Sequence, residues 1–449
     1  MAVLLTHTKN RILSNIVKRV LILTYYWPPI GGAGVQRWLK HSKYLREFGW
    51  EPVIYTASNP DRSIVDESLV AEIPEDIEVV FNRVFEPYDI YRALTGAKKS
   101  EAVSHGFTDA TGKSGIVNRL GMWVRANFFI PDARKFWIKP SIKVITKYLK
   151  TSPVDVIIST GPPHSMHLIA MELNKKTGIP WVADFRDPWT NNDFYDKLPL
   201  TKWADQRHKS YELEVLQKAS RVVTVSWNWA NQISEMSGRK VDVVTNGFDP
   251  SDFKTKSSGS NKKFVILHAG SMYSDRNPRV FWNALGEMVT NNDGFKNDLE
   301  IKLTGTIDGS VIRSIHEAGL KDNTELISYQ PHNIVIESMQ NASVLLLLLN
   351  DSSDILGRIP GKLFEYLAAG RFIMCIGNTD GDSAKIISET QSGTSRMFDD
   401  YQGISEDLEK AYNQWQKGSL DQQAHSIDNY TRKSCTQKYS EIFNSLQKG

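Results

Sequence analysis

The sequence is poor in cysteine, in long apolar runs and in net charge. Two cysteines in 449 residues are too few for a disulfide framework or a cysteine-rich zinc site, which fits a reducing compartment. No apolar run reaches the roughly 18 residues of a membrane-spanning helix. The N-terminal segment has a short apolar start and late basic residues, an order untypical of a signal peptide. A net charge of +3 gives no indication of nucleic acid as a partner. These absences predict a cytoplasmic protein, at most peripheral to a membrane.

Basic charge is nevertheless concentrated in one segment, residues 113–150. It holds nine Lys or Arg residues against a single acid, Asp132. The same segment carries Trp123, Phe128, Phe129, Phe136 and Trp137. Basic residues interleaved with aromatic ones suit an anionic membrane surface or a lipid-phosphate ligand. The alternative is a half-buried helical connector whose basic side chains face water.

Short apolar runs alternate with amphipathic helical stretches, such as 34–50 and 165–178, along the whole chain. This pattern is typical of parallel sheets covered by helices on both faces. A polar break at 253–263 divides two such series, so we expect two Rossmann-like α/β domains with a cleft between them. Residues 427–449 have helical periodicity. The predicted strands are 19–26, 51–57, 154–160, 181–185, 221–226, 241–246, 264–270, 299–305, 324–329, 343–350 and 371–377.

Three loops of the first domain combine glycine, histidine or charge at predicted strand ends. Gly31, Gly32 and Gly34 precede a helix, where a ligand can approach the backbone; a tight strand-to-helix turn explains them equally well. His164 begins a helix after a strand, although a packing histidine is the commoner case. The segment "DFRDPW" places Asp184, Arg186, Asp187 and Trp189 together, and charges leaving an apolar strand are costly unless they pair or bind something.

The second domain carries the features that suit a phosphate. Gly270 permits close approach of a ligand, and Arg276 precedes a helix. In "GRIPGKLFEYLAAG", Pro360 and Gly370 mark the start and end of a helix. Lys362 and Glu365 share one face near its N-terminus, where a diphosphate and ribose hydroxyls could bind; a surface ion pair is the plain alternative.

Asn246-Gly247 is a turn signal at the end of the first domain. Asp380-Gly381-Asp382 superficially resembles a metal-binding pair of acids. A helix cap explains its second acid better, and the sequence offers no zinc spacing and no Walker loop, so we expect no metal and no cofactor.

Together, "PPIGGAGVQR", "TNGFD", "HAGSMYSDRNP" and "IPGKLFEYLAAG" resemble the family-4 glycosyltransferases of the two-Rossmann GT-B fold, over roughly residues 19–448. The resemblance implies metal-independent, retaining transfer of a sugar, of the hexosyltransferase type, from a nucleotide sugar to a glycan acceptor. "DFRDPW" resembles a subset that assembles bacterial cell-surface polysaccharides, which implies a lipid-linked acceptor at the inner face of the membrane.

The same resemblance assigns roles to domains and residues. It makes 19–252, completed by the helix 427–449, the acceptor domain, and 262–426 the donor domain. It gives Arg276 and Lys362 the donor diphosphate, with Gly270 and Asn246 beside them, and gives Glu365 the ribose. The glycines at 31, 32 and 34 would reach the donor phosphates and the acceptor. Asp184, Arg186 and Asp187 occupy the place where relatives present a catalytic histidine, and His164 and Trp189 lie on the acceptor side.

One position departs from the family pattern. Relatives carry a sugar-contacting Glu eight residues before Glu365, and this chain has Gly357 there, with Asp354 nearby. The acid is missing or displaced, and the Asp380–Asp382 loop is one alternative source. The departure keeps two alternatives open, a nucleotide-sugar epimerase of the same fold and a catalytically inactive nucleotide-sugar-binding homologue.

Overall fold

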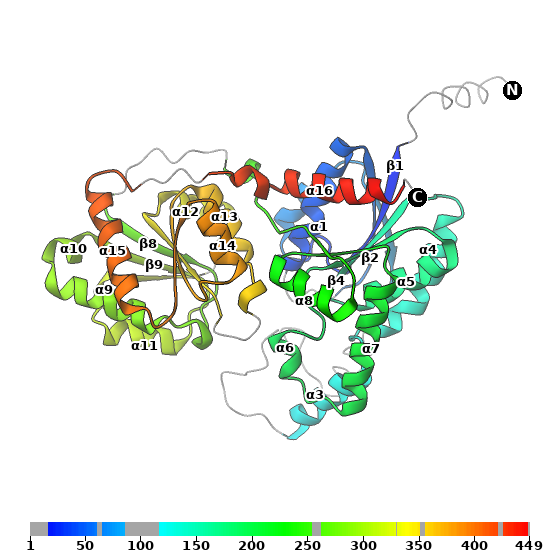
Figure 1. Ribbon diagram of the computed structural model, residues 1–449, viewed down its shortest axis with the longest axis horizontal. Helices are drawn as coiled ribbons and strands as arrows, with labels where there is room; N and C mark the ends of the chain where they lie inside the picture. Colours follow the sequence, from blue (N-terminus) through cyan, green and yellow to red (C-terminus); the bar gives the residue numbers. More distant parts are fainter. Residues whose placement is uncertain are drawn as a thin grey trace. The chain divides into compact units, whose positions relative to one another are not determined.

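The computed structural model describes residues 17–60, 65–85, 116–253, 262–328, 330–350, 355–420 and 425–447. The chain divides into two compact units. The first contains residues up to Val225, then 230–244 and 436 onward; the second contains 226–229 and 245–435. Each unit is a parallel sheet with helices packed on it (Figure 1). The predicted pair of Rossmann-like units is therefore confirmed. The predicted C-terminal segment 427–449 is shared between the units, with the division after Cys435.

The sheet of the first unit has the strand order β3-β2-β1-β4-β5-β6-β7, and all neighbouring strands are parallel. The strand order reverses between β1 and β4, so the carboxyl ends of these two strands form the topological switch point where ligands bind in such sheets. The strands are β1 (Lys18–Leu23), β2 (Trp50–Ala57), β3 (Glu78–Asn82), β4 (Val156–Gly161), β5 (Trp181–Phe185), β6 (Arg221–Thr224) and β7 (Asp242–Val243).

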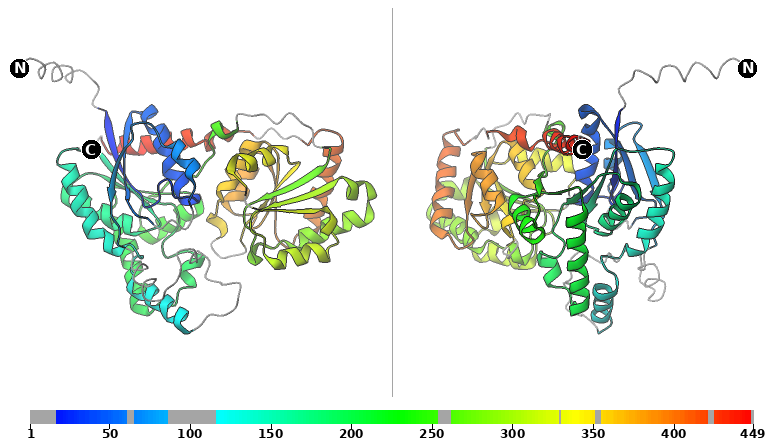
Figure 2. Two further views of the ribbon diagram at one scale, coloured as in Figure 1. Left: turned by 180° about the vertical axis from the view of Figure 1, so that it is seen from behind. Right: turned by 45° about the vertical axis from the view of Figure 1, so that its right-hand side comes forward.

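Helices cover both faces of this sheet, as the two views of Figure 2 show. Helix α5 confirms the predicted helical stretch 165–178 and ends at Gly178, whose φ is 71°. The predicted helix 34–50 was too long, because Gly49 turns the chain at φ 79° and Trp50 begins β2. The helices are α1 (Ala33–Tyr44), η1 (Leu45–Phe48), η2 (Glu67–Glu72), α3 (Ile116–Phe128), η3 (Lys135–Trp137), α4 (Ile138–Leu149), α5 (Ser165–Thr177), α6 (Asp193–Asp196), α7 (Lys202–Lys218), α8 (Trp227–Ser237) and α16 (Arg432–Ser445).

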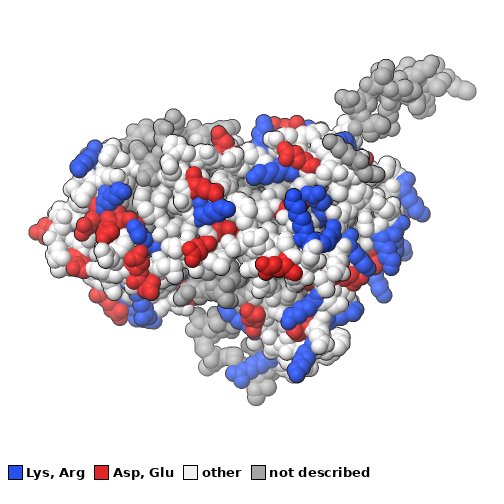
Figure 3. All heavy atoms as spheres, viewed as in Figure 1, with Lys and Arg blue, Asp and Glu red and all other residues white. Residues whose placement is uncertain are grey.

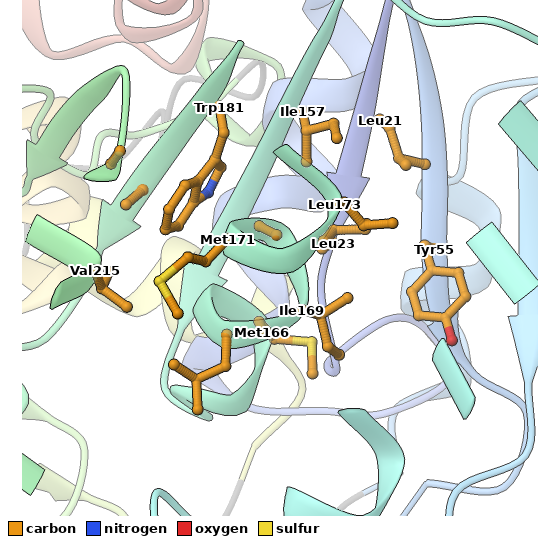
Figure 4. Packing of buried hydrophobic residues seen from close by; sticks show 14 of the residues in the cluster. Leu21, Leu23, Tyr55, Ile157, Met166, Ile169, Met171, Leu173, Trp181 and Val215 are labelled. Carbon is orange, nitrogen blue, oxygen red and sulfur yellow. The ribbon is translucent and has the colours of Figure 1, made fainter. Parts of the chain in front are cut away.

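The core of the first unit lies between the sheet and the helices. Figure 4 shows Leu21 and Leu23 of β1 beside Ile169 and Leu173 of α5, with Trp181 of β5 beyond Ile157 of β4. All six side chains are fully buried. Burying a Leu or Ile side chain stabilises the fold by about 1.5–3 kcal/mol. Because helices cover both faces of the sheet, successive side chains of a central strand are all buried, which explains why these strands are continuous apolar runs in the sequence.

The second unit repeats the plan with the strand order β10-β9-β8-β11-β12-β13, again all parallel. Its switch point lies between β8 and β11. The strands are β8 (Phe264–Ala269), β9 (Leu299–Thr304), β10 (Thr324–Ile327), β11 (Val344–Leu348), β12 (Phe372–Ile376) and β13 (Gly393–Arg396). The helices are η4 (Pro250–Phe253), η5 (Ser274–Arg276), α9 (Arg279–Asn291), α10 (Asp293–Asp298), α11 (Gly309–Glu317), η6 (Lys321–Asn323), α12 (His332–Asn341), η7 (Ile355–Gly357), α13 (Gly361–Ala369), α14 (Asp382–Glu389), α15 (Tyr401–Gln416) and η8 (Ile427–Tyr430).

The basic segment folds as α3, η3 and α4, with Lys113 outside the described residues. Helix α4 packs Ile142 and Ile145 into the core and leaves its lysines exposed, and Lys and Arg gather over it in Figure 3. In α3 an apolar stripe faces solvent instead. Leu120, Trp123 and Phe128 are 59%, 39% and 54% exposed. An exposed apolar stripe of this kind is unusual for a helix that only connects other elements.

Candidate functional site

The switch point of the second unit gathers the predicted phosphate-binding residues. Strand β8 ends in His268 and Ala269, and the chain then turns at Gly270 with φ 114°. Helix α13 starts at Gly361 after Pro360 and stops at Gly370 in the left-handed conformation, as its sequence predicts. This placement brings the amine of Lys362 against the Gly270 turn. A Cβ built on Gly270 would lie 3.0 Å from the Lys362 Nζ, so only glycine leaves this space open.

The Lys362 amine is largely buried and lies close to a second cation. Burial and the nearby Arg276 lower the pKa of Lys362 to about 7. Among the residues that the structure describes, no carboxylate lies within ion-pair distance of this amine, since Glu365 pairs with His332 Nε2 at 3.1 Å. A buried amine close to a guanidinium at a strand end forms a site that favours an anionic ligand.

A second glycine shapes the same turn. Gly305 follows β9 with φ 121°, and a Cβ there would lie 2.8 Å from the carbonyl carbon of Gly270. The Gly270 amide donates to the Thr304 carbonyl at 2.7 Å. The two glycine turns therefore pack together at the ends of neighbouring strands, an arrangement that leaves backbone accessible to a ligand.

Within the loop at Asp380–Asp382, the carboxylate of Asp382 is already engaged and is not available as the missing acid. Asp382 is 2% exposed, and its carboxylate accepts the backbone amide and side-chain amide of Asn228, each at 2.9 Å. No group of three metal-ligating side chains occurs within the described ranges.

Gly357 is required by packing. A Cβ built on it would lie 2.2 Å from Cδ1 of Trp229, a buried side chain of the same unit. The indole therefore fills the space that a side chain at position 357 would need. Asp354, the other acid considered, lies outside the described residues.

Asn246 belongs to the second unit with the residues that follow it. Its carbonyl accepts the Cys435 thiol at 3.8 Å, and a Cβ on Gly247 would lie 2.3 Å from the Tyr430 carbonyl oxygen. The described contacts of this turn are thus with residues 430–435.

In the first unit, Arg186 joins three strand-end loops. Its Nη1 donates to the Gly34 carbonyl at 3.1 Å, its Nη2 donates to the Pro162 carbonyl at 3.4 Å, and its Nε pairs with Asp187 at 3.3 Å. A Cβ on Gly34 would lie 3.0 Å from the guanidinium. Gly32 caps α1 with φ 92°. The structure brings the glycine loop, Arg186 and Asp187 together, and the Asp187 side chain is half exposed.

Asp184 is a structural residue rather than the catalytic group predicted from the sequence. It is 0% exposed, and its carboxylate accepts from Arg37, Trp38 Nε1, Thr160 Oγ1 and the Tyr439 hydroxyl at 2.8–3.1 Å. Burial acts to raise the pKa of Asp184, but Arg37 and these donors hold it below its usual range. A carboxylate so enclosed cannot reach a substrate.

His164 and Trp189 are also buried, at 8% and 3% exposure, so the predicted direct contact with an acceptor is corrected. Their rings stack with centroids 4.5 Å apart, and Trp189 Nε1 donates to His208 Nδ1 at 3.1 Å. Burial lowers the pKa of His208 to about 4, which keeps it an acceptor. Beneath them Glu212 accepts the Thr190 hydroxyl, and burial raises its pKa to about 7. This stack supports the loop that carries Arg186 and Asp187.

Sequence reasoning missed Arg37, His268, Gly305 and Trp229. Arg37 lies in an amphipathic helix, and nothing local marks its partner 147 residues away. For two of the missed residues the sequence did contain a signal. Gly305 ends a predicted strand, and His268 lies two residues before Gly270. None of the helices in the described part of the chain has the length and apolar character needed to cross a bilayer.

Comparisons with known proteins agree with this geometry. Residues 103–252 match Glycosyltransferase Family 4. No curated protein matches the chain significantly in sequence. Among solved structures, sucrose-phosphate synthase from Thermosynechococcus elongatus matches with a TM-score of 0.61 and 9% identity, over 96% of this chain and 99% of that one.

Two further structures show the same fold. Anabaena HepE in complex with UDP matches with a TM-score of 0.61 and 14% identity, over 95% of this chain and 100% of that one. WaaG, a glycosyltransferase involved in lipopolysaccharide biosynthesis, matches with a TM-score of 0.57 and 14% identity, over 94% and 99%. The chain therefore has the GT-B fold of two Rossmann-like units, and its residues 103–252 are similar to glycosyltransferase family 4.

Proposed function

We propose that the protein transfers a sugar from a nucleoside-diphosphate sugar to a glycan acceptor. The observation that carries this proposal is the Lys362 amine, held beside Arg276 and the open Gly270 turn with no carboxylate counter-charge among the described residues. HepE, which shares the fold, was crystallised with UDP-glucose. A diphosphate would pair its negative charge with the Lys362 amine at the open turn.

The chemistry proposed for this site is electrostatic. As the bond from the sugar to the diphosphate breaks, negative charge grows on the leaving phosphate, and Lys362 and Arg276 stabilise it. We propose that Glu365, on the same helix, binds the ribose hydroxyls. We further propose a retaining outcome without a metal ion, in which the departing phosphate takes the proton of the attacking acceptor hydroxyl.

The test is a panel of UDP-, GDP-, ADP- and dTDP-sugars, assayed for hydrolysis and for transfer to added glycans, with and without EDTA. We expect turnover with one nucleotide class, unaffected by EDTA. Lys362→Ala and Arg276→Ala should each lose about 2–4 kcal/mol of transition-state stabilisation. Lys296→Ala, an exposed cation of α10, is the matched control. Full activity in both site variants would contradict the proposal.

One observation keeps an inactive, nucleotide-sugar-binding protein as the second candidate. Trp229 fills the space at Gly357, where relatives carry an acid that contacts the sugar. The same panel separates the candidates, since an inactive homologue binds a nucleotide sugar without hydrolysing or transferring it. An epimerase would interconvert two sugars of the panel and need no acceptor.

For the acceptor we propose a lipid-linked glycan, reached by docking of the first unit on an anionic membrane surface. The support is the exposed apolar stripe of α3, formed by Leu120, Trp123, Val124 and Phe128 at helical spacing. Exposed Arg119 and Arg125 lie on the same helix. Each basic residue near an anionic surface contributes about 1 kcal/mol, and the apolar stripe can enter the interface.

Vesicle co-sedimentation tests this docking. We expect binding to phosphatidylglycerol vesicles that weakens with salt, and little binding to phosphatidylcholine. Trp123→Ser with Phe128→Ser should abolish it. Leu326→Ser, which removes an equally exposed apolar residue from β10, should not. Equal, negligible binding under all conditions would leave a soluble acceptor.

A further inference from the structure

A buried histidine lies behind the Lys362 amine and takes no part in the chemistry proposed above. His268 is 0% exposed in β8. Its Nδ1 lies 2.9 Å from the carbonyl oxygen of Leu346 in β11, and its Nε2 lies 3.4 Å from the Lys362 Nζ. The ring thus spans the switch point between the two strands and ends at the amine.

The Leu346 carbonyl decides the tautomer of this ring. A carbonyl oxygen can only accept a hydrogen bond, so Nδ1 carries the proton and donates it. The Nε2 lone pair then faces Lys362. Burial, together with the cations Lys362 and Arg276, holds the pKa of His268 well below its usual value, so the ring stays neutral. Tyr366, whose hydroxyl accepts the Ala269 amide at 3.0 Å, fixes the same strand end.

Among the residues that the structure describes, the Lys362 amine has few alternatives to the His268 acceptor. The charged groups that act on it are Arg276 and Glu365. Arg276 repels it, and Glu365 is paired with His332. The Gly270 turn provides open space on one side.

We infer that His268 is a positioning residue for Lys362: its Nε2 accepts one N–H of the amine and directs the amine at the Gly270 turn. The inference deepens the proposed function, because the ligand that the amine meets there is the proposed diphosphate. The remaining N–H groups of Lys362 are then free to donate to phosphate oxygens. Removing the acceptor leaves an ammonium in a buried site with one partner fewer.

Two amide variants distinguish the contact made by Nδ1 from the contact made by Nε2. In His268→Asn the amide nitrogen replaces Nδ1 and keeps the bond to Leu346, but nothing replaces Nε2. In His268→Gln the amide oxygen reaches the Nε2 position and restores the acceptor. We expect His268→Asn to weaken binding of inorganic pyrophosphate and of UDP roughly tenfold at pH 7, and His268→Gln to stay within about threefold of the wild type. Thermal unfolding checks that both variants fold.

A second measurement needs no ligand. NMR titration of the lysine side chains in the intact protein, with Lys362→Met for assignment, should show the pKa of Lys362 lowered by about half a unit or more in His268→Asn and unchanged in His268→Gln. Tyr366→Phe, which alters the same strand end without touching the amine, should leave it unchanged. An unshifted Lys362 in His268→Asn overturns the inference. Failure of the wild type to bind pyrophosphate or UDP would overturn the proposed function alone.

Discussion

At the residue scale, the protein separates charges that support the fold from charges available to a ligand. Asp184 and Asp187 are three residues apart, yet one is enclosed by five hydrogen-bond donors and the other is half exposed. Their sequence context is the same acidic-basic cluster. They differ because successive side chains of a strand point to opposite faces of the sheet, and Asp184, in β5, points into the core towards Arg37. That partnership joins distant parts of the chain and could not be predicted from the sequence.

Asp184→Asn should destabilise the first unit strongly. The substitution leaves the buried guanidinium of Arg37, 1% exposed, without its counter-charge. Losing one partner of a buried ion pair costs about 3–5 kcal/mol. Urea unfolding measures the change, and Asp187→Asn is the control that should unfold like the wild type. Equal midpoints for the two variants would contradict the assignment of Asp184 as a structural residue.

Glu212 predicts a pH dependence of stability. Its folded-state pKa of about 7 lies above its ordinary value of 4.5, so the folded protein binds the proton more tightly than the unfolded chain. The cost of charging Glu212 is therefore absent below pH 4.5 and fully present above pH 7. At pH 8, Glu212→Gln should raise the free energy of unfolding, measured in urea, by about 1–3 kcal/mol over the wild type. This gain should shrink towards pH 5. A gain independent of pH would show that Glu212 is not the titrating group.

Gly357 and Trp229 predict a coupled pair. Gly357→Ala should cost about 1–3 kcal/mol, because the new methyl group meets the indole ring. In a Trp229→Ala background the same substitution should cost much less, so the double-mutant cycle gives a coupling energy. Additive effects in thermal unfolding would mean that packing on Trp229 does not exclude a side chain there.

At the scale of elements, apolar runs predicted all the central strands and two of the four edge strands. Strand β5 was predicted with its observed bounds, because both of its faces are buried and its residues are apolar throughout. β3 and β13 were missed. Each is one of the two edge strands of its sheet, and the sequence "GTSR" of β13 carries no apolar signal. The other two edge strands, β7 and β10, contain apolar residues and were predicted, although the predicted segments run past their observed ends. The helix over 361–369 was predicted from Pro360 and Gly370, the residues that mark its start and its end.

The C-terminal part of α16 is held on the first unit by aromatic packing. Phe443, 0% exposed, meets the ring of Trp50 at 5.2 Å, and Tyr439 meets Trp38 at 4.9 Å. Phe443→Ala should therefore lower stability by about 3–5 kcal/mol. Glu441→Ala, on the exposed side of the same helix, is the matched control. Similar melting temperatures for both variants would show that α16 contributes little to the unit.

At the scale of the whole molecule, the two units share one sheet topology but carry different residues at their strand ends. In the second unit, the switch point holds His268, Gly270 and Lys362, which suit an anion. In the first, the strand ends hold the glycine loop and Arg186, and α3 adds its exposed apolar stripe. The two α/β units and the pair of cations Arg276 and Lys362 could be predicted from the sequence. The contacts of His268 with Leu346 and Lys362 could not be predicted, because these residues come from separate elements of the chain.

The most direct test of this account is calorimetric titration of UDP, and of the diphosphate matching any active donor, into the wild type and Lys362→Met in EDTA. The account predicts saturable binding by the wild type, with proton uptake near pH 8 because an anion raises the pKa of Lys362 from about 7. It also predicts binding weaker by roughly 30-fold or more in the variant, with no proton uptake. Equal affinities and equal proton uptake in the two proteins would contradict it.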